Sequence, residues 1–191
     1  MHWQKNLNLF IKAALAALIM HVILFPDLTQ YQNKAMGYRL IFYPSLALSL
    51  FIAHKFKLIK NNYPHYQDIL ISLVITLDMF GNTFGLYGSI EWWDDIMHLI
   101  NCGLITVLVI SIIPSIFKNH VVYKFIYTVG VVSFLQIIWE IAEYFTFITT
   151  NHNEISTAYR DTIGDLFFGQ IGSYLAFFVI LRLSKRTKNI T

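Results

Sequence analysis

The sequence predicts an all-α protein: a polytopic membrane helix bundle of six transmembrane helices that forms one integral membrane domain over residues 1–191. Hydrophobic residues make up 56% of the chain and charged residues only 13%, against roughly 25% charged residues in an average soluble domain. The mean hydropathy is +0.54. At about 20 residues per spanning helix, this length leaves no room for a separate soluble domain.

Six apolar segments are long enough to cross about 30 Å of hydrocarbon with some tilt. Pro26-Asp27 follows the first segment, and Pro114 falls near the end of the fourth. No small-residue cleavage site follows Phe25, so we expect the first segment to be retained rather than removed as a signal peptide. The six segments are Leu7 to Phe25, Tyr38 to His54, Ile69 to Gly85, Asp95 to Phe117, Val121 to Ile148 and Thr162 to Leu183.

The cations gather in short loops and tails on one side of this six-span arrangement. Because cytoplasmic loops retain lysine and arginine, we expect a bacterial inner (plasma) membrane protein with both termini in the cytoplasm. Lys12, early in the first helix, is expected to snorkel toward that side. The position of these cations in loops beside the lipid bilayer explains the net charge of +3 better than nucleic-acid binding does, so we expect no nucleic-acid partner. Ten of these cations are Lys5, Lys55, Lys57, Lys60, Lys118, Lys124, Arg182, Lys185, Arg186 and Lys188; Lys34, Arg39 and Arg160 fall on the other side.

Most carboxylates map to the opposite, outer half of the bundle, where four helices carry polar stripes. In the stretch EWWDDIMHLINCG, Asp94, His98 and Asn101 share one helical face. In the fifth segment the polar residues step by three, four and three, and the sixth and third segments each carry two polar residues one turn apart. These three further stripes are Ser133, Gln136, Glu140 and Glu143; Asp161 and Asp165; and Asp78 and Asn82.

Ionised groups at mid-bilayer cost about 2.5–3.5 kcal/mol each, so these stripes should turn inward. Carboxylates at one depth with an imidazole suit a divalent metal, and magnesium, manganese, zinc and ferrous iron all remain open. We expect His98, Glu140 and Glu143 to be catalytic. The candidate metal ligands are Asp94, His98, Glu140, Glu143, Asp161 and Asp165.

Structural explanations stand beside the functional ones. Asp94, Asp95 and His98 fit a helix start stabilised by an acid–histidine pair, and Asp161 fits an N-cap of the sixth helix. Asp78 with Asn82 fits hydrogen bonding between helices. The single cysteine, Cys102, forms neither an internal disulfide nor part of a zinc cluster.

The order D-x-x-x-H or D-x-x-H, then E-x-x-E, then D-T-x-x-D-L and a glycine-rich helix resembles the uncharacterised bacterial inner-membrane family that includes YjdF. It is similar, more distantly, to the VanZ-like family. The resemblance covers Glu91 to Ser173 and places the motifs on Asp94 or Asp95 with His98, on Glu140 and Glu143, and on Asp161, Thr162 and Asp165, with Gly172 as a small packing position. Glu143 and Gly169 stand where the VanZ-like pattern has glutamine and asparagine, which favours the YjdF-like family. Neither family implies a reaction.

Three functional hypotheses follow. The first is a metal-dependent enzyme acting on a lipid or cell-envelope substrate. The second is a proton-coupled transporter that uses the same acids and histidine as a relay. The third is a polar network that only stabilises the bundle. The sequence leaves the metal, the reaction and the oligomeric state open.

Overall fold

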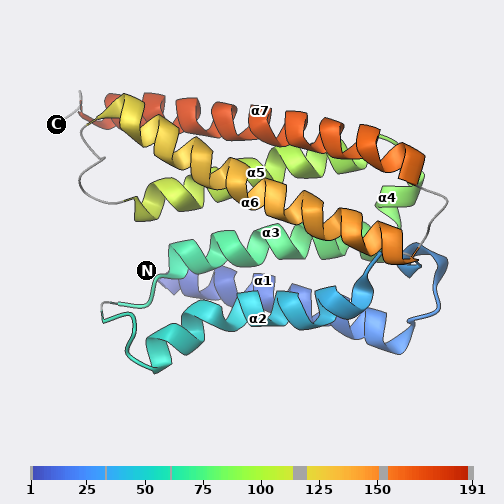
Figure 1. Ribbon diagram of the computed structural model, residues 1–191. Helices are drawn as coiled ribbons and strands as arrows, with labels where there is room; N and C mark the ends of the chain where they lie inside the picture. The colour runs from blue at the N-terminus through green and yellow to red at the C-terminus, as the bar shows by residue number, and fades with distance from the viewer. Residues whose placement is uncertain (1, 33, 61, 114–119, 151–154, 189–191) are drawn as a thin grey trace. The chain divides into compact units, whose positions relative to one another are not determined.

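The computed structural model describes residues 2–32, 34–60, 62–113, 120–150 and 155–188, which form helices and no strand (Figure 1). This confirms the predicted all-α membrane bundle. The elements are α1 (His2–Leu24), the 3-10 turn η1 (Thr29–Tyr31), α2 (Met36–Lys55), α3 (His65–Thr83), α4 (Leu86–Ser89), α5 (Trp93–Ile112), α6 (Val121–Thr150) and α7 (Ile155–Lys188).

Five of the described helices, α1, α2, α5, α6 and α7, are long and apolar enough to cross a membrane. The remaining predicted span is α3, whose 19 residues extend about 28 Å. By its hydropathy α3 is not one of the five candidate spans, and its buried residues include Asp68, Asp78 and Asn82. These polar side chains are paired within the protein, so α3 does not have to be apolar all round.

The chain divides into two compact units, Met1–Trp93 and Asp94–Thr191. The first contains α1 to α4, with α3 packed against both α1 and α2. The second contains α5, α6 and α7, with α6 and α7 side by side (Figure 1). That these units form one membrane domain stays a prediction.

One end of α3 is tied to α1 through a fully buried carboxylate. Oδ2 of Asp68 accepts hydrogen bonds from Nδ2 of Asn8 at 2.6 Å, from Nζ of Lys12 at 2.7 Å and from the Tyr63 hydroxyl. Burial, together with this bond to Asp68, raises the pKa of the Tyr63 phenol, so it remains a donor. The ammonium of Lys12 thus pairs with Asp68, and its snorkelling toward the cytoplasmic side stays a prediction.

The other end of α3 is tied to α2 and to α4. Nε of Arg39 lies 3.1 Å from Oδ2 of Asp78, which also accepts from the Tyr43 hydroxyl. The Tyr87 hydroxyl donates to Oδ1 at 2.8 Å, and Nδ2 of Asn82 lies 3.2 Å from Oδ2. Arg39 thus lies within α2, in the predicted segment Tyr38 to His54, as a part-buried partner of Asp78.

The structure differs from the sequence prediction in two further places. The helix expected to start at Thr162 begins at Ile155, so Asp161 lies within α7 and is not its N-cap. The short α4 and η1 were not predicted. Asp94 and Asp95 do occupy the first turn of α5, where acids favour the helix dipole.

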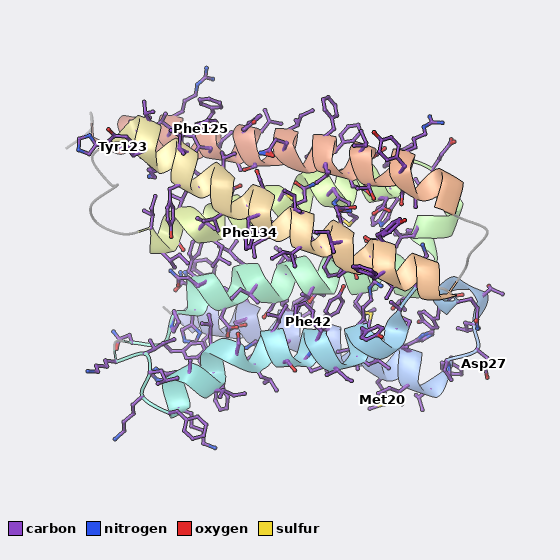
Figure 2. The ribbon with its side chains drawn as sticks, viewed as in Figure 1. Met20, Asp27, Phe42, Tyr123, Phe125 and Phe134 are labelled. Carbon is purple, nitrogen blue, oxygen red and sulfur yellow. The ribbon has the colours of Figure 1, made fainter. Side chains whose placement is uncertain are left out.

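Close packing of small and aromatic residues holds the second unit together. A Cβ on Gly103 would lie 3.5 Å from the Gly172 carbonyl oxygen, and the Thr106 and Ser173 hydroxyls lie 2.8 Å apart. Phe125, labelled in Figure 2, stacks on Tyr174 and meets Phe177 edge-on.

Many large apolar side chains stay exposed, as expected for helices that face lipid. Among those labelled in Figure 2, Met20 is 53% exposed, Phe42 49% and Phe134 63%.

Candidate metal-binding site

The polar face predicted on α6 is the face that packs on α7. Oγ of Ser133 donates to Oε1 of Gln170 at 2.8 Å, and Nε2 of Gln136 donates to the backbone oxygen of Asp165 at 2.5 Å. Gly169 leaves the space that the Gln136 amide occupies, since a Cβ there would collide with it. This register brings Glu140, one turn beyond Gln136, to the level of Asp165.

A close approach of two backbones holds α5 against α7. Gly172 lies so close to the backbone of Leu99 that a Cβ would overlap the Leu99 carbonyl. The small packing position implied by the family resemblance is therefore confirmed. Since His98 precedes Leu99 and Asp165 lies two turns before Gly172, the close approach places the imidazole beside the Asp165 carboxylate.

His98 lies between carboxylates on both sides of its ring. Nδ1 is 3.6 Å from Oε1 of Glu140, while Nε2 is 3.6 Å from Oδ1 of Asp94 and 3.7 Å from Oδ1 of Asp165. The side chains of His98, Glu140 and Asp165 are 11%, 6% and 4% exposed. These separations exceed the roughly 2.7–3.2 Å of a direct hydrogen bond.

Two groups of potential ligand atoms share this imidazole. Asp94, His98 and Asp165 form one group, and His98, Glu140 and Glu143 form the other; within each, the atoms lie within 4.8 Å of one another. Ligand atoms on a tetrahedral zinc ion, with bonds of 2.0–2.1 Å, are about 3.4 Å apart. The 3.6 Å between Nδ1 of His98 and Oε1 of Glu140 is close to that spacing, and the other atoms of each group lie within 4.8 Å of one another.

One oxygen of the Glu140 carboxylate is unsatisfied. Its Oε1 is buried and has no hydrogen-bond partner, although buried polar atoms in proteins nearly always have one. The imidazole of His98 lies among four carboxyl groups, those of Asp94, Glu140, Glu143 and Asp165. A buried oxygen without a hydrogen bond, beside a nitrogen ligand, suits a bound cation.

Five of the six predicted ligands thus come together: Asp94, His98, Glu140, Glu143 and Asp165. Asp161 is exposed on α7 and belongs to neither group. Asp78 and Asn82, predicted at the same depth, form the Arg39 network of the first unit, which fits their structural explanation. Gln170 supports the site through Ser133, but no stripe in the sequence pointed to it.

Comparison with known proteins adds a family. Residues 7–186 match the family described as "Predicted membrane protein (DUF2238)". No curated protein and no solved structure matches the chain. Because the match covers nearly the whole sequence, the chain belongs to this family of predicted membrane proteins.

Proposed function

We propose that the second unit binds a divalent metal ion and uses it in an enzymatic reaction on a lipid or cell-envelope substrate. The observation that carries the proposal is the buried Oε1 of Glu140, which has no hydrogen bond and lies 3.6 Å from Nδ1 of His98. The ligands in this proposal are Nδ1 of His98 and the carboxylates of Glu140 and Glu143.

The second carboxylate group then has a supporting role. A metal-bound histidine nearly always donates its other ring N–H to a carboxylate or carbonyl, which fixes the ring and strengthens it as a ligand. Oδ1 of Asp165 and Oδ1 of Asp94, at 3.7 and 3.6 Å from Nε2, are the acceptors available for that proton. Asp165 is the buried member and so the main positioning residue.

The proposed chemistry is metal-assisted hydrolysis. A divalent ion polarises a substrate carbonyl or phosphoryl oxygen and makes bound water easier to deprotonate. His98, Glu140 and one oxygen of Glu143 would hold the ion, and the other oxygen of Glu143, which is only half-buried, would accept the proton of the attacking water. Imidazole with carboxylates suits zinc, manganese or ferrous iron.

The depth of the site supports a membrane-associated substrate. His98, Glu140 and Asp165 lie five, six and seven residues from the nearer ends of their candidate spans at Trp93, Thr146 and Ala158. At 1.5 Å per residue these are about 8–10 Å inside the helix ends, within one leaflet of a hydrocarbon core about 30 Å thick.

The lysine distribution supports a location in the bacterial inner membrane with both termini cytoplasmic, which would open the site to the outer face. The resemblance to the YjdF-like family, and more distantly to VanZ-like proteins, fits a shared set of acids and histidine.

A proton-coupled carrier is the second candidate, because an imidazole with carboxylates at both nitrogens is also a proton relay. Substrate-dependent flux in liposomes, lost on Glu140→Gln, would favour the carrier.

Metal analysis of the full-length protein, purified in detergent without added chelator, tests the enzyme proposal. We expect about one ion per chain, a loss of more than about 100-fold in affinity for His98→Ala and Glu140→Gln, and a smaller 10–100-fold loss for Asp165→Asn. Glu91→Gln, an exposed acid outside both groups, is the control. A metal-free protein whose stability and activity ignore chelators would refute the proposal.

A further inference from the structure

A second candidate site lies in the first unit, at the connection from α2 to α3. His54, Lys55, Lys57, Ile59 and Lys60 line an open cavity of about 620 Å³. Among the described residues, none of the three lysines forms an ion pair. Three ammonium groups around one cavity favour an anionic ligand, and phosphate accepts charge-assisted hydrogen bonds from lysine.

The cavity has one firmly built wall. The ring of His54 meets Tyr63 edge-on, with centroids 5.4 Å apart, and Tyr63 also contacts His65 at 4.7 Å. Tyr63 is in turn held by its hydrogen bond to the buried Asp68. Nδ1 of His54 is buried without a hydrogen-bond partner, which adds an unsatisfied polar atom to a residue that lines the cavity.

The side chains that flank the lysines indicate what kind of anion fits. Lys57 has φ of 60°, the left-handed conformation that caps the C-terminus of α2, where the Leu58 N–H donates to the Ala53 carbonyl and the Lys57 N–H to the His54 carbonyl. Its neighbours Phe56 and Leu58 are 72% and 77% exposed. Apolar side chains alternating with lysines just beyond the end of a candidate span suit the interface, where acyl chains meet charged head groups.

We propose that this cavity binds the phosphate of an anionic phospholipid head group, with Phe56 and Leu58 against its acyl chains. Lys55, Lys57 and Lys60 contact the phosphate, and His54 supplies a ring nitrogen at the inner wall. The site is independent of the metal-binding site, since it uses other residues and another ligand.

Native mass spectrometry of the full-length protein in detergent tests this, with phosphatidylglycerol and phosphatidylcholine of matched chains as probes. Phosphatidylglycerol should bind more tightly to the unchanged protein. Each lysine near an anionic head group contributes roughly fivefold in affinity, so Lys55→Gln, Lys57→Gln and Lys60→Gln together should weaken binding by about 100-fold. Phosphatidylcholine binding should stay the same.

The matched control removes three positive charges from the same predicted side but outside the cavity: Lys5→Gln, Lys124→Gln and Arg182→Gln. The proposal requires this variant to keep most of the phosphatidylglycerol affinity. Equal losses in both variants would show that the lysines act only as topology anchors and would overturn it. Binding of inorganic phosphate with the same lysine dependence, without any preference for phosphatidylglycerol, would also overturn it and identify a free anion as the ligand.

Discussion

Both units hold carboxylates within membrane helices, but the partners that surround these carboxylates differ between the two units. In the first unit Asp68 and Asp78 each lie against a full cation, Lys12 and Arg39, with further donors on the same oxygen. In the second unit Glu140 and Asp165 share a single imidazole at 3.6 and 3.7 Å, beyond hydrogen-bonding distance.

The difference separates a structural role from a functional one. Oδ1 of Asp68 also lacks a hydrogen bond, yet its Oδ2 receives three, one from an ammonium. Such a buried pair needs no ligand to satisfy it, whereas Oε1 of Glu140 is buried beside His98 without a hydrogen bond and suits a bound cation. Removing the charge of one carboxylate should therefore change stability in opposite directions in the two units.

The largest expected effect is in the first unit. Asp78→Asn leaves the Arg39 guanidinium buried without its counter-charge, so the free energy of unfolding should fall by about 3–5 kcal/mol. Unfolding in mixed micelles measures it, with Asp27→Asn, an exposed acid of the same unit, as control. The double variant Arg39→Met with Asp78→Leu should recover part of the loss, because it removes both charges but leaves the buried Tyr43 hydroxyl without this acceptor. If Asp78→Asn lowered the free energy of unfolding no more than Asp27→Asn does, the proposed difference between the two units would be wrong.

A medium effect is expected where α5 meets α7. Gly172→Ala forces the helices apart because its Cβ overlaps the Leu99 carbonyl, and it should cost about 1–3 kcal/mol of unfolding free energy. Gly130→Ala is the matched control, because nothing lies within 4 Å of a Cβ there. Metal affinity should fall only in Gly172→Ala, since that contact positions His98. If Gly172→Ala and Gly130→Ala changed metal affinity equally, the close approach of Gly172 to Leu99 would not determine the position of His98.

The smallest effect has the opposite sign. In metal-free protein, Glu140→Gln removes one negative charge from a group of carboxylates and should raise the unfolding free energy by about 1 kcal/mol. The same unfolding measurement in the presence of chelator checks this. A loss as large as that of Asp78→Asn would instead show that the His98 network serves stability alone.

The sequence predicted the helices and the residues that meet at His98 because both depend on helical spacing. Ser133, Gln136 and Glu140 share one face whatever the helix packs against, and an amphipathic face turns inward. Asp78 showed the limit of this reasoning. Its spacing with Asn82 resembled the other stripes, but its partner Arg39 lies 39 residues earlier, and no local pattern encodes that pairing.

The start of α7 at Ile155 was missed for a related reason. Its first two turns mix polar and apolar residues, so the apolar segment was predicted to start at Thr162, although the helix begins before the candidate span at Ala158. Nor does spacing determine whether Asp161, exposed on α7, contributes to the site.

The pairing of Lys12 with Asp68 bears on how the chain enters the bilayer during synthesis. An unpaired lysine within a membrane helix costs about 2.5–3.5 kcal/mol at the bilayer centre, and Asp68 emerges 56 residues after Lys12. Until α3 has left the ribosome, α1 carries a charge without its partner. The two helices are therefore expected to leave the translocon for lipid together, with α1 held at the lateral gate until α3 arrives.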